Sequence, residues 1–333
     1  MKAKSSDPDG RTRQFARNQK LEHLLAELNT LLGPAETDLL ERYRMPAFPL
    51  VLVVGPHRSG TTLFMQWLAN TRLVAYPTNL LSRFYGAPVI GAKIQLLLTD
   101  PRYSFRDELG EFSSRVEYAS DNGKTKGVHA PNEFWYFWRR FLAEPGRDVW
   151  SDDELRQSLD IATMRAELAG IMDVFQKPFA AKGMLFNYNI PCLDAMFDQI
   201  VWVQIQRDPV TNVASALDAT KRQLGSEAEW YSFKIPEYEQ LSGLPALIQT
   251  AGQIHYINRA VSTGIAAVAE ARKLVVDYEA FCADPAQVFS ALCGKLGLGE
   301  CPYDGPASFR VTRDSAQTDV AAISAALAQF DGR

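Results

Sequence analysis

The chain has 333 residues, enough to bury a large core in one big domain or two modest ones. Its 47% hydrophobic and 22% charged residues are typical of a globular protein, and its net charge of −4 gives no reason to expect nucleic acid or an anionic membrane as a partner. The 4 cysteines lack the close spacing of a zinc or redox pair and favour buried thiols in a reducing compartment.

The N-terminal region predicts a flexible start followed by a helical extension. Residues 1–12 are polar, and from Gln14 leucines recur at helical spacing until Gly33 and Pro34, where the pattern predicts the end of the helix. We expect this helix, within an extension over 13–47, to pack on the main body, because a coiled-coil dimer seam needs about three or more heptads. The sequence leaves the oligomeric state open.

No targeting or membrane segment is evident in the sequence. The first residues lack the apolar core of a signal peptide, and no apolar run approaches the roughly 20 residues that span a bilayer. A cytoplasmic location without a transmembrane segment is therefore expected.

The first chemical motif follows a predicted strand. "FPLVLVVG", residues 48–55, is a short apolar run typical of a strand buried on both faces of a parallel sheet, and "TTLFMQWLAN" after it has helical periodicity. Between them stands "GPHRSGTT". Strand, glycine-bearing turn and helix form the context that a phosphate-binding loop requires.

The identity of the loop residues argues against an ordinary nucleotide triphosphatase. Gly55, Gly60 and Thr62 fit the frame of a phosphate loop, but Thr61 stands where the lysine should be. The cation is instead Arg58, inside the loop, whose guanidinium can bind two oxygens of one phosphate. No evident magnesium ligand set accompanies it, so no metal is expected.

The middle of the chain predicts a helical, aromatic insertion. Residues 80–180 carry no repeats and are expected to form the side of the protein that receives an acceptor. Within them "FWYFWRRF", residues 134–141, holds six aromatic residues in eight positions. Aromatic stripes at helical spacing favour core packing over an exposed stacking surface.

Two further strand-to-helix units complete the pattern. The strand at 199–205 is followed by Arg207 and, two helical turns on, by Ser215, a pair able to hold a second phosphate at the carboxyl end of a strand. The strand at 273–277 runs into a turn around Tyr278. Together the units predict a single α/β domain over residues 13–333, with a mostly parallel P-loop type sheet flanked by helices and a core at about 48–305.

The motifs resemble those of sulfotransferases that use PAPS, 3′-phosphoadenosine 5′-phosphosulfate. "VVGPHRSGTTLFMQWL" is similar to their 5′-phosphosulfate loop, "VWVQIQRDPVTNVASAL" to their 3′-phosphate motif, and "LVVDYEAFCADPAQVFSALCGKLGL" to the strand and helix that close the fold. The Pro-x-Arg-Ser-Gly-Thr form of the loop is more similar to bacterial and protein-tyrosine sulfotransferases than to the cytosolic enzymes, which have a lysine there. The resemblance assigns the 5′-phosphosulfate to Arg58, Ser59, Gly60, Thr61 and Thr62, and the 3′-phosphate to Arg207 and Ser215, with Tyr278 also among the donor-binding residues.

The resemblance further implies the transfer of a sulfuryl group to an acceptor hydroxyl, with PAP, adenosine 3′,5′-bisphosphate, as product. Arg58 is placed to stabilise the charge of the leaving phosphate. A general base is needed, and either His129 or Glu133 fits the role, since the family uses both residue types. Lys182 resembles a lysine that the family carries near the donor. The acceptor is expected to be a small molecule or glycan, most simply a saccharide or glycolipid.

Two other functions fit the same loop. A P-loop nucleotide kinase or NTPase would require magnesium and prefer ATP. A catalytically inactive nucleotide-binding protein would bind PAP without transferring sulfate.

Overall fold

A computed structural model describes residues 10–106, 108–112, 116–121, 123–144, 146–311 and 319–331; residues 1–9 of the expected flexible terminus lie outside this part. In it the strands form one all-parallel sheet in the order β2-β1-β3-β4. The strands are β1 (Leu50–Val54), β2 (Phe179–Lys182), β3 (Ile200–Gln206) and β4 (Lys273–Asp277). The predicted α/β class with a parallel sheet is confirmed.

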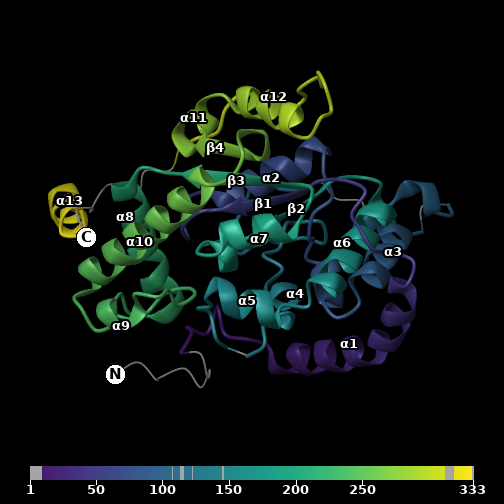
Figure 1. Cartoon of the computed structure of the whole chain (residues 1–333), viewed down its shortest axis with the longest axis horizontal. Helices are drawn as coiled ribbons and strands as arrows, with labels where there is room; N and C mark the ends of the chain where they lie inside the picture. Colours follow the sequence, from purple (N-terminus) through teal and green to yellow (C-terminus); the bar gives the residue numbers. More distant parts are fainter. Residues whose placement is uncertain are drawn as a thin grey trace.

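Helices cover both faces of the sheet and extend beyond its β2 edge (Figure 1). The α-helices are α1 (Gln19–Leu40), α2 (Thr61–Thr71), α3 (Pro88–Thr99), α4 (Trp135–Arg140), α5 (Asp152–Ser158), α6 (Ile161–Phe175), α7 (Ile190–Met196), α8 (Pro209–Leu224), α9 (Tyr238–Leu241), α10 (Ala246–Ala266), α11 (Tyr278–Ala283), α12 (Pro285–Lys295) and α13 (Val320–Ala328). Short 3₁₀ helices are η1 (Leu81–Phe84), η2 (Pro101–Tyr103), η3 (Gly110–Phe112), η4 (Met184–Phe186) and η5 (Glu270–Arg272).

The central strands are buried because two cores sandwich them. All five residues of β1 are buried: Leu50, Leu52 and Val54 face one core and Val51 and Val53 the other. The first core contains side chains of α4 to α8 and α10, and the second those of α2, α11 and α12. Alternation of one strand's side chains between two apolar layers explains the continuous hydrophobic run in the sequence. In Figure 1, α11 and α12 lie above the sheet and α4, α5 and α7 below it.

The N-terminal helix differs from the prediction in length. It does not end at Gly33 and Pro34 but continues to Leu40. Side chains on either side of the proline anchor it to the body: Asn29 bonds the backbone near η1, and the buried Glu36 accepts hydrogen bonds from the first amides of α3. These contacts compensate for the hydrogen bond that a proline removes inside a helix.

The strand β2, which ends at Lys182, was not predicted from the sequence. "FAAK" is only four residues long and carries two alanines, so it has no strand pattern of its own. It pairs in parallel with β1, with Lys182 opposite Val53. Lys182 therefore lies at the carboxyl end of a strand beside the loop.

The helices of the described residues include none with the length and apolar character needed to cross a membrane.

Candidate functional site

The loop between β1 and α2 folds into a tight turn that needs glycine at two positions. Gly55 and Gly60 have φ angles of +142° and +101°, and Arg58 has +64°. A Cβ atom on Gly60 would lie 2.2 Å from the ring of Tyr278, and one on Gly55 would lie 2.8 Å from the carbonyl oxygen of Ile205. Close packing against β3 and against the first residue of α11 thus requires glycine at both positions.

Side chains from other elements hold the loop in place. The buried Asn187 accepts from the Gly55 N–H at 3.2 Å and donates to the Gly55 carbonyl at 2.9 Å. Asn212 of α8 donates to the His57 carbonyl at 2.9 Å. The sequence analysis missed both asparagines, because each acts through a contact between segments far apart in the chain.

The helix that follows the loop starts without a side-chain cap. Gly60 occupies the N-cap position of α2, and within the described part of the chain no side chain caps the first amides of the helix. The hydroxyl of Ser59 is buried and has no hydrogen-bond partner among the described residues. Uncapped amides at a helix N-terminus favour an anion, so the loop residues fit a phosphate or sulfate group.

The two predicted arginines meet at this loop. Arg207 Nη1 donates to the carbonyl oxygen of Arg58 at 2.8 Å, and Arg58 Nε donates to Ser215 Oγ at 3.3 Å. The Arg207 guanidinium lies 4.9 Å from the ring centre of Tyr278 and 3.9 Å from the Glu279 carboxylate. The structure therefore brings the loop, the β3–α8 turn and the start of α11 into one basic site.

On the other side of the loop, a lysine and a glutamate form a half-buried ion pair. Lys182 Nζ lies 2.9 Å from Thr62 Oγ1 and 3.2 Å from Glu133 Oε1. The second Glu133 oxygen accepts from Trp135 Nε1 at 2.5 Å and lies 3.8 Å from Lys124 Nζ. Glu133, two residues before α4, is thus aimed at the loop through Lys182.

The charges around Glu133 keep it ionised. Burial by itself raises the pKa of this carboxyl, but Lys182, Lys124 and the indole hydrogen bond from Trp135 outweigh it and lower the pKa to about 2. Burial in turn lowers the pKa of the Lys182 ammonium, and Glu133 opposes that effect. The pair combines an anion and a cation, both within reach of the loop.

His129, the other candidate base, is held elsewhere. Its Nε2 lies 2.7 Å from the Phe112 carbonyl oxygen, and its own carbonyl accepts from the Tyr76 hydroxyl. In the described residues no hydrogen bond joins the His129 ring to the loop, to Lys182 or to Glu133. The geometry favours Glu133 over His129.

A short turn lies over the loop. Asp121 and Lys124 exchange backbone hydrogen bonds of 2.8 and 2.9 Å. A Cβ atom on Gly123 would lie 3.5 Å from Thr62 Oγ1 and 3.6 Å from Arg58 Nη1. This turn therefore covers one side of the site, and Lys124 reaches Glu133 from it.

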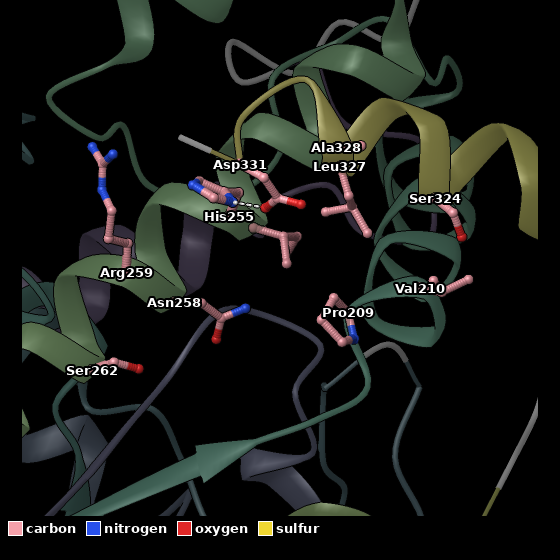
Figure 2. Close-up of a pocket in the computed structure, with 11 residues that line it drawn as sticks. Pro209, Val210, His255, Asn258, Arg259, Ser262, Ser324, Leu327, Ala328 and Asp331 are labelled. Atoms are coloured by element: carbon pink, nitrogen blue, oxygen red, sulfur yellow. Dashed lines mark ion pairs between the residues drawn. The ribbon is translucent and has the colours of Figure 1, made fainter. Parts of the chain in front are cut away.

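A cavity of about 430 Å³ lies apart from these residues, between α8, α10 and α13. Figure 2 shows His255 and Asp331 facing each other at one end, with Asn258 and Ser262 further along α10. None of the candidate residues of the loop site lines this cavity. In the chain as far as it is described, no group of His, Cys, Asp or Glu side chains could hold a metal ion.

The fold and the site define a parallel α/β protein with a glycine-bearing loop and an uncapped helix start at the carboxyl edge of its sheet. A family model described as "Sulfotransferase family" matches residues 49–301. The chain belongs to the sulfotransferase family. The predicted resemblance is thereby confirmed at the level of the family.

Solved structures support the same fold. Sulfotransferase STF1 from Mycobacterium tuberculosis H37Rv aligns with a TM-score of 0.52 and 15% identity, over 92% of this chain and 82% of that chain. Sulfotransferase STF9 from Mycobacterium avium aligns with a TM-score of 0.51 and 16% identity, over 98% of this chain and 80% of that chain. Identities this low support the fold alone. No curated protein sequence matched the chain.

Proposed function

We propose that the protein transfers the sulfuryl group of PAPS to a hydroxyl group of an acceptor, in the bacterial cytoplasm. The observation that carries the proposal is the meeting of Arg58, Arg207 and Ser215 at the loop. Two arginines at neighbouring strand ends suit a donor that carries phosphate groups at two positions of one ribose. Four free cysteines agree with a reducing compartment.

The donor residues divide the two anionic ends between them. Arg58, Ser59 and the first amides of α2 would bind the 5′-phosphosulfate, and Arg207 and Ser215 the 3′-phosphate. The bound donor supplies a sulfuryl group attached to a phosphate leaving group. Tyr278 supports both regions, because its ring packs against Gly60 and lies beside the Arg207 guanidinium.

Glu133 and Lys182 would carry out the proton and charge transfers. The acceptor oxygen forms a bond to sulfur while the bond from sulfur to the 5′-phosphate oxygen breaks, and Glu133 takes the acceptor proton. Negative charge develops on the departing phosphate, where Lys182 and Arg58 stabilise it. When Lys182 turns toward that charge it leaves Glu133, whose pKa then rises toward a value suited to a base.

The acceptor would approach along a partly apolar wall. The ion pair packs against Trp135, Trp138, Met184 and Leu185, with no room for a water molecule between them. Trp135 is the partly exposed member of this group, so its ring is the aromatic face beside Glu133 on which a sugar ring would stack. We therefore propose a saccharide or glycolipid hydroxyl as acceptor.

A thermal-shift comparison of PAP, PAPS, AMP, and ATP with magnesium tests the donor. At equal concentrations, a ligand that binds the folded state more tightly raises the melting temperature further, so PAP is expected to stabilise the protein by several degrees more than AMP. ATP with magnesium matching PAP would favour a kinase or NTPase instead. PAP stabilisation with no conversion of PAPS to PAP, across a panel of saccharide and glycolipid acceptors, would favour an inactive nucleotide-binding protein.

A further inference from the structure

Tyr231, which no sequence motif singled out, is held against the loop from three directions. It lies in the segment between α8 and α9, and its ring packs edge-to-face on the His57 ring at 5.2 Å and 69°. Gln253 of α10 donates to the Tyr231 carbonyl at 2.9 Å, and Gln223 of α8 donates to its hydroxyl at 3.0 Å. A side chain fixed by two helices and the loop itself has a defined direction.

The hydroxyl of Tyr231 retains a proton to donate. A phenol is both donor and acceptor, and in its hydrogen bond with the Gln223 amide, among the described residues, the Tyr231 oxygen is the acceptor. Burial raises the pKa of Tyr231; the charge of Arg58 opposes this effect and that of Glu133 adds to it. The Tyr231 hydroxyl is therefore protonated at neutral pH. It lies close enough to Arg58 and to Glu133 for the charge of each to act on its pKa.

The ring of His57 provides the surface on which Tyr231 packs. The His57 ring is buried, and neither of its nitrogens has a hydrogen-bond partner among the described residues. Burial and the charge of Arg58 lower the pKa of His57 to about 3, so the ring is neutral at physiological pH. A neutral ring at this position acts as a packing surface, and its contact with Tyr231 links the loop to the α8–α9 segment.

We propose that the Tyr231 hydroxyl donates a hydrogen bond to a 5′-phosphosulfate oxygen of the bound donor, and that His57 is the residue that positions it. The inference rests on the proposed function, since it requires PAPS at the loop. It adds an uncharged donor to the cations Arg58 and Lys182. An uncharged donor binds the anionic group without adding to the repulsion between the two cations.

Calorimetric titration of Tyr231→Phe with PAPS and PAP tests this role. Loss of a hydrogen bond to a charged group should weaken PAPS binding about tenfold or more. Tyr43→Phe is the matched control, because it removes a hydroxyl that bonds Asp173 at 3.2 Å, away from the site. The melting temperatures of the two unliganded variants should fall by similar small amounts. Unchanged PAPS affinity in Tyr231→Phe, whatever its melting temperature, would overturn the proposal.

Substitutions at His57 provide a second test that does not alter Tyr231. His57→Ala should weaken PAPS binding, since it removes the surface on which Tyr231 packs, and His57→Phe should recover most of the lost affinity. Equal loss in both variants would mean that the histidine nitrogens bind the donor and would overturn the positioning role. Failure of the wild-type protein to bind PAP or PAPS at all would instead reject the proposed function, and this inference with it.

Discussion

At the scale of single residues, Glu133 and Lys182 would supply the two groups that the proposed reaction requires, a base for the acceptor hydroxyl and a cation for the leaving phosphate. Only 5% of the Lys182 side chain and 25% of the Glu133 side chain is exposed, so their charges are poorly screened by solvent. Thr62 orients the lysine from the loop, and Trp135 orients the carboxylate from α4. The proposed base is thus held beside the lysine that would neutralise the leaving phosphate.

Replacement of the Glu133 carboxylate should lower turnover without lowering the affinity for PAP. Glu133→Gln should reduce the conversion of PAPS to PAP by roughly 10²–10⁴-fold, the usual contribution of a general base, while PAP binding remains close to wild type. The measurement is turnover with a responsive acceptor alongside PAP titration. His129→Ala is the comparison variant, and a loss of turnover there with full activity in Glu133→Gln would assign the base to the histidine.

The lowered pKa of Glu133 predicts that the stability of the fold depends on pH. This pKa is about 2 in the folded protein, below the ordinary 4.5, so the unfolded chain takes up the proton first as the pH falls. The stabilisation from ionised Glu133 is therefore fully present above its ordinary pKa and is lost as the pH falls through about 2. The difference in melting temperature between wild type and Glu133→Gln should stay constant from neutral pH down to the ordinary pKa of 4.5 and shrink as the pH falls from there toward about 2.

An exposed glutamate provides the control for that series. Glu239→Gln changes the same chemical group on the surface of α9. Its difference from wild type should stay small at every pH. A Glu133→Gln difference that grows on acidification would contradict the assignment of a depressed pKa.

Arg207 tests the second phosphate site. Arg207→Ala should weaken PAP binding by about tenfold to a hundredfold, the range expected for a charge-assisted hydrogen bond, and reduce the advantage of PAP over AMP. Arg222→Ala is the matched control, since that arginine is exposed at the end of α8 and paired with Asp218. An unchanged PAP-to-AMP ratio in Arg207→Ala would show that the 3′-phosphate binds elsewhere.

At the scale of elements, the loop between β1 and α2 depends on the contact between Gly60 and Tyr278. Gly60→Ala should lower both the melting temperature and PAP affinity, because the new methyl group meets the tyrosine ring. Gly127→Ala is the control, since its φ of +104° matches the +101° of Gly60 but nothing lies within 4 Å of the added Cβ. Both variants bear backbone strain of about 1–3 kcal/mol, so equal losses would remove any role for the Tyr278 contact.

The elements that the sequence predicted were those with a local signal. The strands β1, β3 and β4 are apolar runs ended by polar or glycine residues, and their predicted bounds agree within a few residues. The strand β2 and the passage of α1 through Pro34 depend on tertiary contacts, to β1 and to α3, that no local pattern contains. In both places, tertiary packing overrides the local propensity of the sequence.

The same distinction applies to the site. Arg58, Arg207 and Ser215 belong to contiguous motifs and could be named from the sequence. The choice between Glu133 and His129 needed the position of Lys182, and Asn187 and Tyr231 became visible only through contacts across more than a hundred residues. Residues that join the candidate site only through spatial contacts, and that belong to no sequence motif, cannot be identified from a single sequence.

At the scale of the whole molecule, one sheet serves both cores. Side chains of β1 and β3 alternate between the two apolar layers, so neither layer is complete without the shared strands. We therefore expect the described chain to unfold as one domain, with coincident thermal transitions in near-UV and far-UV circular dichroism, and PAP should move both by the same amount. Separate transitions, or a shift in only one of them, would indicate two units.

The side chain of Asn187 carries the pairing of the sheet beyond the end of β2. Gly183 still bonds Val53, and the Asn187 amide then bonds both backbone groups of Gly55, much as the next residue of a strand would. These bonds fix the backbone of the turn without a ligand, so binding of the proposed donor would lose little free energy to ordering it. For the same reason, departure of the proposed product would require no refolding of that turn, which would leave it ready for the next donor.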